Sequence, residues 1–179
     1  MAINNPVPQK KSTLDTAANI AIIIVCAIAA VVLIRNQFFP KQAAGPGNMP
    51  QIEKGEKYAQ LKDMVPTGAN RALVVAVQPG CHFCNDSMPF YKKLLDERNQ
   101  KGSAVKFVAA VPSDDAKPQE AEKFAAVGAQ PDNIAKVDFA AIKVPGTPTL
   151  VLVDNSGKVL NVWVGKLDAG GEKEVLQTL

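Results

Sequence analysis

Two cysteines, Cys81 and Cys84, stand three positions apart, directly after a continuous apolar run (residues 72–77) and a Pro-Gly turn. A cysteine at the start of a helix faces unpaired backbone N–H groups and the positive end of the helix dipole, so its thiolate is stabilised. The second thiol, one turn further on, is close enough to attack a mixed disulfide formed at the first. This spacing indicates thiol–disulfide exchange, with the pair cycling between dithiol and disulfide.

The cysteine count argues against other uses of this pair. The chain has three cysteines, and the third, Cys26, lies alone inside an apolar segment, where it is interpreted as a small apolar residue. One pair and one isolated cysteine do not make the disulfide framework of a small secreted domain. A structural zinc site needs four ligands, and the only histidine, His82, lies between the two cysteines. We therefore expect no metal and no organic cofactor, only a redox-active disulfide between Cys81 and Cys84.

Three neighbours could tune the cysteine pair. A protonated His82 would stabilise the Cys81 thiolate, since a nearby positive charge lowers a thiol pKa; alternatively, His82 is an exposed residue that only shapes the surface. Phe83 is interpreted as a contact or packing residue, and Gly80 directly precedes the first cysteine.

Length and charge set limits on the class of protein. With 179 residues, the chain is expected to form one domain plus appendages. Its formal net charge of +3 is too small to indicate nucleic-acid binding, and no basic patch interleaved with aromatic residues is present.

The N-terminal part predicts a membrane anchor. Residues 1–15 form a polar tail, and residues 16–34 then contain no charged side chain before Arg35. About 20 apolar residues match the hydrocarbon core of a bilayer, so residues 16–35 are predicted to be a transmembrane helix. The alternatives are a cleaved signal peptide and a buried core helix. The run is longer than a signal-peptide core, and no convincing cleavage site follows it.

The remainder is divided into a linker and a domain. Residues 36–51 are rich in Pro and Gly and are predicted to be a linker; residues 52–179 are predicted to form one domain. Buried strands are predicted at 72–77 and 105–111, and a hairpin at 149–153 and 158–164 around an Asp-Asn-Ser-Gly turn. Helices are predicted at 52–64, 81–100, 118–127 and 171–179, the third with Glu120 and Glu122 near its positive end, while 134–142 is ambiguous. This order predicts an α/β fold with the cysteines at the carboxyl end of a strand.

Three features together resemble the thioredoxin-fold family over roughly residues 70–179. The first is Cys81-His82-Phe83-Cys84 directly after a buried strand. The second is Pro89, at a position where the family often carries a proline that kinks the active-site helix. The third is the segment 144–149 (VPGTPT) before a strand, which resembles the cis-proline loop of the family with Pro148 as the cis residue. An alternative is that the loop is entirely trans.

The resemblance implies a fold, an activity and partners. It implies a thioredoxin fold, that is, a central mixed sheet flanked by helices. Cys81 would be the attacking thiol with the more exposed sulfur, Cys84 would resolve the mixed disulfide, and Thr147 and Pro148 would border the substrate groove. Together with the anchor, the likeness is to membrane-tethered thiol–disulfide oxidoreductases of the bacterial cell envelope. Partners would be protein dithiol or disulfide substrates and a redox protein that resets the pair.

Localisation follows from the same likeness. Basic residues flank the predicted span almost equally (Lys10 and Lys11 before it, Arg35 and Lys41 after it), so the charge rule does not decide its orientation. Tethered domains of this kind with a short N-terminal tail most often lie outside the cytoplasm. We therefore expect a single-pass protein of the bacterial inner membrane, with its domain on the periplasmic side.

Two departures from the family pattern favour a second hypothesis. Gly80 stands where thioredoxins commonly carry Trp, and Val75 stands where they carry a buried acid that assists the second cysteine. Asp86 is expected to be solvated and a weak replacement. The chain could therefore be an accessory subunit of a membrane complex, with the domain as a binding module and a static disulfide. The small residues of the apolar segment would suit packing against another helix.

Overall fold

The computed structural model describes residues 22, 23, 25–27 and 51–179. Contacts divide the chain into two units, 1–44 and 45–179, and the fold below is that of the second unit. Its elements in chain order are α2 (Ala59–Met64), β1 (Arg71–Ala76), α3 (His82–Asp86), α4 (Met88–Lys101), β2 (Lys106–Val111), α5 (Ala116–Ala126), β3 (Asn133–Lys136), β4 (Thr149–Asp154), β5 (Val159–Val164) and α6 (Ala169–Leu176).

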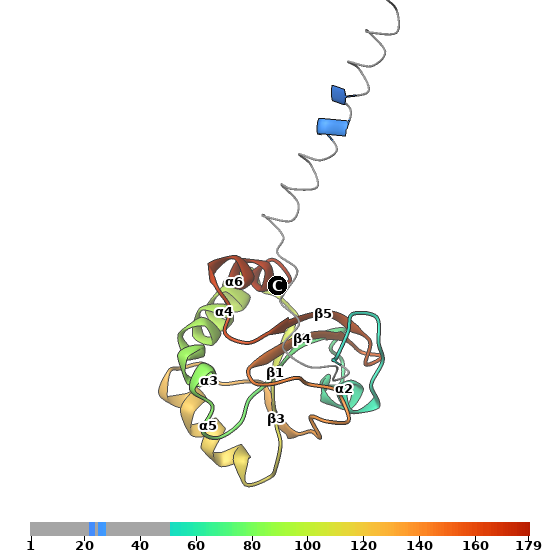
Figure 1. Cartoon of the computed structure of the whole chain (residues 1–179). Helices are drawn as coiled ribbons and strands as arrows, with labels where there is room; N and C mark the ends of the chain where they lie inside the picture. Colours follow the sequence, from blue (N-terminus) through green and yellow to red (C-terminus); the bar gives the residue numbers. More distant parts are fainter. Residues whose placement is uncertain (1–21, 24, 28–50) are drawn as a thin grey trace, which may run out of the picture. The chain divides into compact units, whose positions relative to one another are not determined.

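The strands form one mixed sheet in the order β3-β2-β1-β4-β5 (Figure 1). β1, β2 and β3 run parallel, whereas β4 is antiparallel to both β1 and β5. In the β1–β4 pair, Ala76 faces Thr149, so the end of β1 and the start of β4 lie at the same edge of the sheet. The expected α/β fold with a central mixed sheet and flanking helices is confirmed, as is the hairpin of β4 and β5.

Two apolar layers enclose the sheet. Side chains of β1 alternate between them: Leu73 and Val75 enter the layer that contains residues of α4, α5 and α6, whereas Ala72 and Val74 enter the other. This alternation is the ordinary period of a strand, and both faces are covered, which explains why β1 is continuously apolar. The second layer is completed by α2 and by residues of the connection between β3 and β4, among them Val137 and Ile142.

The predicted helix over 81–100 is in fact two helices, α3 and α4, which meet at Ser87. Pro89 has no backbone N–H to donate to the carbonyl of Asn85, and its ring crowds that carbonyl, so a regular helix cannot continue there. The Ser87 hydroxyl donates to the Phe83 carbonyl at 2.8 Å and so satisfies one of the carbonyls at the break. The apolar side of α4 is buried as predicted.

Two other helix predictions differ in extent from the observed helices, and the structure resolves one stretch that the sequence left ambiguous. The helix expected over 52–64 is confined to α2, because residues 51–58 are instead held by backbone hydrogen bonds to β5 and to the loop before β4. The closing helix begins earlier than predicted, at Ala169, because Asp168 caps it by accepting from the Gly171 N–H at 2.8 Å. The ambiguous stretch 134–142 contributes strand β3 followed by turns.

The predicted membrane anchor and linker lie almost wholly outside the described residues. Of residues 16–35 the structure describes 22, 23 and 25–27, which are helical and exposed. Among the described residues, no helix has both the length and the apolar character needed to cross a membrane.

Glu56 connects the segment before α2 to the rest of the domain through hydrogen bonds. Its carboxylate accepts from the Lys143 ammonium, from the Tyr58 hydroxyl and, at 3.0 Å, from the Glu53 N–H. The hydrogen bond from Lys143 is the largest of the effects that together lower the Glu56 pKa from 4.5 to about 2. Lys143 directly precedes Val144, where the predicted cis-proline loop begins, so this cluster also holds the base of that loop.

The lowered pKa of Glu56 should therefore make the free energy of unfolding depend on pH under acidic conditions. A carboxyl whose pKa is depressed in the folded state stabilises that state above its unfolded pKa and loses the effect as the pH falls through its folded pKa. We expect the stability of the wild type to fall between pH 4.5 and about 2, and that of Glu56→Gln to be lower near neutrality and to fall less in this range. Urea unfolding at several pH values measures this. Glu122→Gln, on an exposed glutamate, is the control, and identical acid profiles for Glu56→Gln and wild type would contradict the assignment.

Candidate functional site

The turn between β1 and α3 is shaped by Gly80, which has a φ of 76°. Only glycine adopts this left-handed conformation at little cost, and the turn it makes brings Cys81 to the start of α3. Cys81 is the N-cap of that helix, and its Sγ accepts from the Cys84 N–H at 3.0 Å. When Cys81 is reduced, the same N–H would stabilise its thiolate, because a hydrogen bond to the charged form of a group favours that form.

Cys81 and Cys84 form a disulfide, with their Cα atoms 5.2 Å apart. Cys84 has no accessible surface, whereas Cys81 retains 8%. Cys81 is the more accessible of the two cysteines, as expected. It is nevertheless less exposed than the sequence suggested, because both cysteines pack into the apolar layer between the sheet and its helices.

The loop before β4 closes over the first cysteine. The Thr147–Pro148 peptide bond is cis, as the resemblance implied. Cys81 Sγ lies 3.4 Å from the Thr147 carbonyl oxygen, although the two residues are 66 positions apart in the chain. The loop is held by the Thr149 hydroxyl, which donates to the Gly146 carbonyl at 2.7 Å, and by the Gly165 N–H, which donates to the Pro148 carbonyl at 2.7 Å.

The two residues between the cysteines are exposed. Phe83 is 57% accessible and does not pack into the core, so its ring is open to contact with another molecule. The His82 side chain is 80% accessible, and its Nε2 lies 3.6 Å from Asp86 Oδ2.

The sequence predicted a solvated Asp86, but in the structure its carboxylate also contacts a distant part of the chain. Its Oδ2 accepts from the Lys166 ammonium at 3.0 Å, which ties α3 to the loop between β5 and α6. The Lys166 hydrogen bond, with a smaller contribution from the charge of His82, lowers the Asp86 pKa against the opposing effect of burial. No pattern in the sequence indicated Lys166, which is 80 positions away.

Val75 is fully buried beside the cysteine pair in the same layer. A charged group is nevertheless buried in the helix-covered part of the domain: Glu120 of α5 has no accessible surface. Glu120 had been interpreted only as an acid near the helix N-terminus. Its spacing from Ala116 and Phe124, four residues on either side, does place it on the buried stripe, so a pattern-based signal existed.

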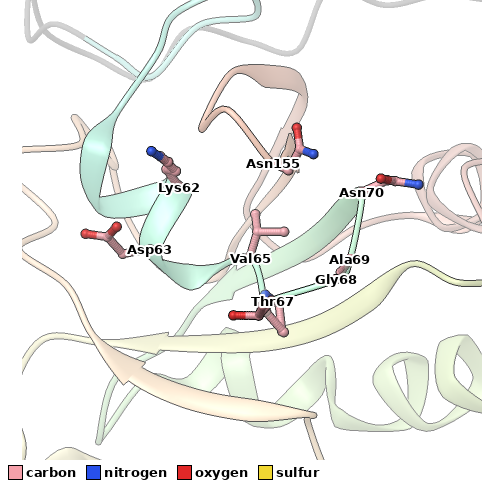
Figure 2. Close-up of a pocket in the computed structure, with 9 residues that line it drawn as sticks. Lys62, Asp63, Val65, Thr67, Gly68, Ala69, Asn70 and Asn155 are labelled. Carbon is pink, nitrogen blue, oxygen red and sulfur yellow. The ribbon is translucent and has the colours of Figure 1, made fainter.

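The described residues show no constellation for a metal: nowhere in this part of the chain do three or more His, Cys, Asp or Glu side chains gather in a way that could hold an ion. A cavity of about 450 Å³ lies at the opposite edge of the sheet from the cysteines, where α2 leads into β1 (Figure 2). Its lining includes Lys62, Asp63, Thr67, Asn70 and Asn155. The disulfide lies outside this cavity.

The sheet order, the helix-covered disulfide at the end of β1 and the cis-proline loop beside it define a thioredoxin-like α/β fold with a CxxC disulfide. The chain belongs to the family of thioredoxin-like domains, whose model matches residues 58–179. No curated protein sequence matches the chain.

The solved structures to which the chain is similar have low sequence identity to it. A candidate protein disulfide isomerase from Bacteroides thetaiotaomicron aligns with a TM-score of 0.50 and 12% identity over 73% of this chain and 89% of that one. The thioredoxin domain of a thiol-disulfide oxidoreductase from Bacteroides vulgatus has a TM-score of 0.49 and 16% identity, over 66% and 83% of the two chains. StoA from Bacillus subtilis has a TM-score of 0.47 and 18% identity, over 62% of this chain and 85% of that one. At these identities the likeness concerns the fold alone.

The left-handed backbone at Gly80 gives a test of the turn that presents Cys81. Gly80→Ala should destabilise the protein by about 1–2 kcal/mol, because a Cβ is strained at positive φ even where space is open. Gly146→Ala, which also meets no atom within 4 Å but lacks a positive φ, should be neutral or stabilising by up to about 1 kcal/mol. Urea denaturation measures both, and equal effects of the two substitutions would contradict the geometry.

Proposed function

We propose that the protein is a membrane-tethered thiol–disulfide oxidoreductase that exchanges disulfides with protein substrates through Cys81 and Cys84. The observation that carries the proposal is the asymmetric burial of the pair beside the Thr147 carbonyl. The partly accessible Cys81 attacks or is attacked, and the enclosed Cys84 resolves the mixed disulfide. No cofactor beyond this disulfide is part of the proposal.

The surroundings of the pair favour a polypeptide as substrate. Phe83 is exposed next to the disulfide, and Val164, which pairs with Thr149, is the other exposed large apolar residue of the described domain. The Thr147 carbonyl lies against Cys81 Sγ, where an extended chain could add to the loop through its backbone. Such an open surface suits a macromolecule, whereas a small ligand is normally enclosed in a cavity.

The tether is part of the proposal because of residues 16–35, which have the length and apolar composition of a membrane span. We place the domain on the periplasmic side of a bacterial inner membrane, where disulfides persist. A second dithiol protein would return the pair to its starting redox state.

A second candidate function is an accessory subunit of a membrane complex, with a static disulfide. The observation that favours it is the low accessibility of both cysteines. In that case the exposed Phe83 would contact a subunit of the complex and not a substrate.

Cysteine variants of the full chain test the proposed exchange. The wild type should accelerate the reduction of insulin disulfides by dithiothreitol, and Cys81→Ser should abolish this acceleration, because the accessible sulfur is lost. Reduced Cys84→Ser should instead accumulate a mixed disulfide with insulin, detected by mass spectrometry under non-reducing conditions, since no second thiol releases it. Cys26→Ser is the control and should behave as wild type. Full exchange activity in both Cys81→Ser and Cys84→Ser, or none in the wild type, would overturn the proposal.

A further inference from the structure

Three short segments that are far apart in the sequence meet around the disulfide and form a closed ring of contacts. They are residues 81–86, which run from Cys81 to the end of α3, residues 147–148 of the cis-proline loop, and residues 165–166 directly after β5. The Thr147 carbonyl oxygen lies 3.4 Å from Cys81 Sγ, which joins the first segment to the second. The Gly165 N–H donates to the Pro148 carbonyl at 2.7 Å, which joins the second segment to the third.

The contact that closes the ring joins Asp86 to Lys166. The Lys166 ammonium donates to Asp86 Oδ2 at 3.0 Å, and His82 Nε2 lies 3.6 Å from the same oxygen. Of the three contacts in the ring, this is the one made by two side chains. A substitution can therefore open the ring at this point while the reacting sulfurs and the cis-proline loop keep their own atoms.

α3 depends on tertiary contacts because it is a short, separate helix. It has five residues and ends at Ser87, where α4 begins. A helix of this length is not stable by itself in water. Its buried side is anchored by Cys84, which has no accessible surface, whereas the Asp86 and Lys166 side chains are 32% and 48% accessible. The ion pair thus holds the exposed side of α3.

The ring is bordered by the two exposed large apolar side chains of residues 51–179. Phe83 is 57% accessible and precedes Asp86 by three positions, so both lie on one face of α3. Val164 is 38% accessible, pairs with Thr149 and directly precedes the third segment. The two apolar side chains therefore belong to the two parts of the chain that the ion pair connects.

We propose that Lys166 is a positioning residue that sets the spacing between α3 and the cis-proline loop, and with it the fit of an extended substrate segment. This inference rests on the proposed function. A substrate chain that adds to the Thr147 carbonyl through its backbone would bring its neighbouring side chains within reach of Phe83 and Val164. Because Lys166 holds α3 in place before the substrate arrives, less conformational entropy is lost on binding, which favours affinity.

The effect of Lys166 should be modest and should concern substrate binding. Both partners of the ion pair are partly accessible, and such pairs change an equilibrium by about two- to fivefold. Lys166 acts through Asp86, so its loss should remove binding that the ground state and the transition state share. Such a loss raises KM and leaves kcat unchanged. A residue that only supported the fold would instead change the amount of active protein, which appears as a lower kcat.

Steady-state reduction of insulin by dithiothreitol, catalysed by the full-length protein, measures both constants. Lys166→Met should raise the KM for insulin by about two- to fivefold with little change in kcat. Lys166→Arg, which keeps a cation within reach of Asp86, should restore most of the wild-type KM. Asp86→Ala should behave like Lys166→Met, and the double variant should be no worse than either, because both remove the same contact. Lys93→Met, which breaks a 3.7 Å pair with Glu172 between α4 and α6, is the control and should behave as wild type.

Amide hydrogen exchange tests the ring without relying on activity. In oxidised Lys166→Met, the hydrogen-bonded Gly165 N–H should exchange with deuterium about two- to fivefold faster than in the wild type. The Val159 N–H, which is also hydrogen-bonded but lies at the other end of β5, should not change. An unchanged KM in both Lys166→Met and Asp86→Ala, a loss confined to kcat, or unchanged exchange at Gly165 would overturn the inference. No acceleration of insulin reduction by the wild type would instead overturn the proposed function, and the inference with it.

Discussion

The antiparallel pairing of β4 with β1 is the constraint on which the site depends. It sets Ala76 opposite Thr149, and so brings Cys81 and Thr147, 66 positions apart, to a distance of 3.4 Å between sulfur and carbonyl oxygen. A slip of one residue in this register would turn every side chain of β4 to the other face of the sheet. Because β1 and β4 are buried on both faces, such a slip would disturb the packing of both apolar layers.

The site combines an open surface with a closed interior. The Phe83 ring and part of Cys81 are accessible and the Thr147 carbonyl lies against Cys81 Sγ, whereas Cys84 is enclosed in the apolar layer that also contains Tyr91. Exchange of disulfides with a protein substrate needs the open surface, since a macromolecule has to reach one of the two sulfur atoms. The closed interior shields Cys84 from other reactants, because the residue has no accessible surface.

The sequence predicted the elements of the site better than their surroundings. Local patterns were enough for the strand before Cys81 and for the hairpin, because turn residues and apolar runs determine them. The cis Thr147–Pro148 bond was implied only by the resemblance to the thioredoxin-fold family. The break at Ser87 was missed, since a proline pattern indicates a kink but not which hydrogen bonds replace the lost one. Lys166 beside Asp86 could not be found at all, because that contact depends on tertiary packing. For Glu120, the spacing of four residues from Ala116 and from Phe124 indicated a buried position, but only its place near the helix N-terminus was interpreted.

The central claim is that the Cys81–Cys84 disulfide is exchanged and not static, and its reduction potential tests this most directly. Equilibration of the full-length protein with glutathione buffers, followed by alkylation and mass analysis, gives the potential of the pair. The account predicts a value within the range of catalytic pairs, from about −270 to about −120 mV. A value below about −300 mV, typical of structural disulfides, would contradict it and favour an accessory subunit with a static disulfide.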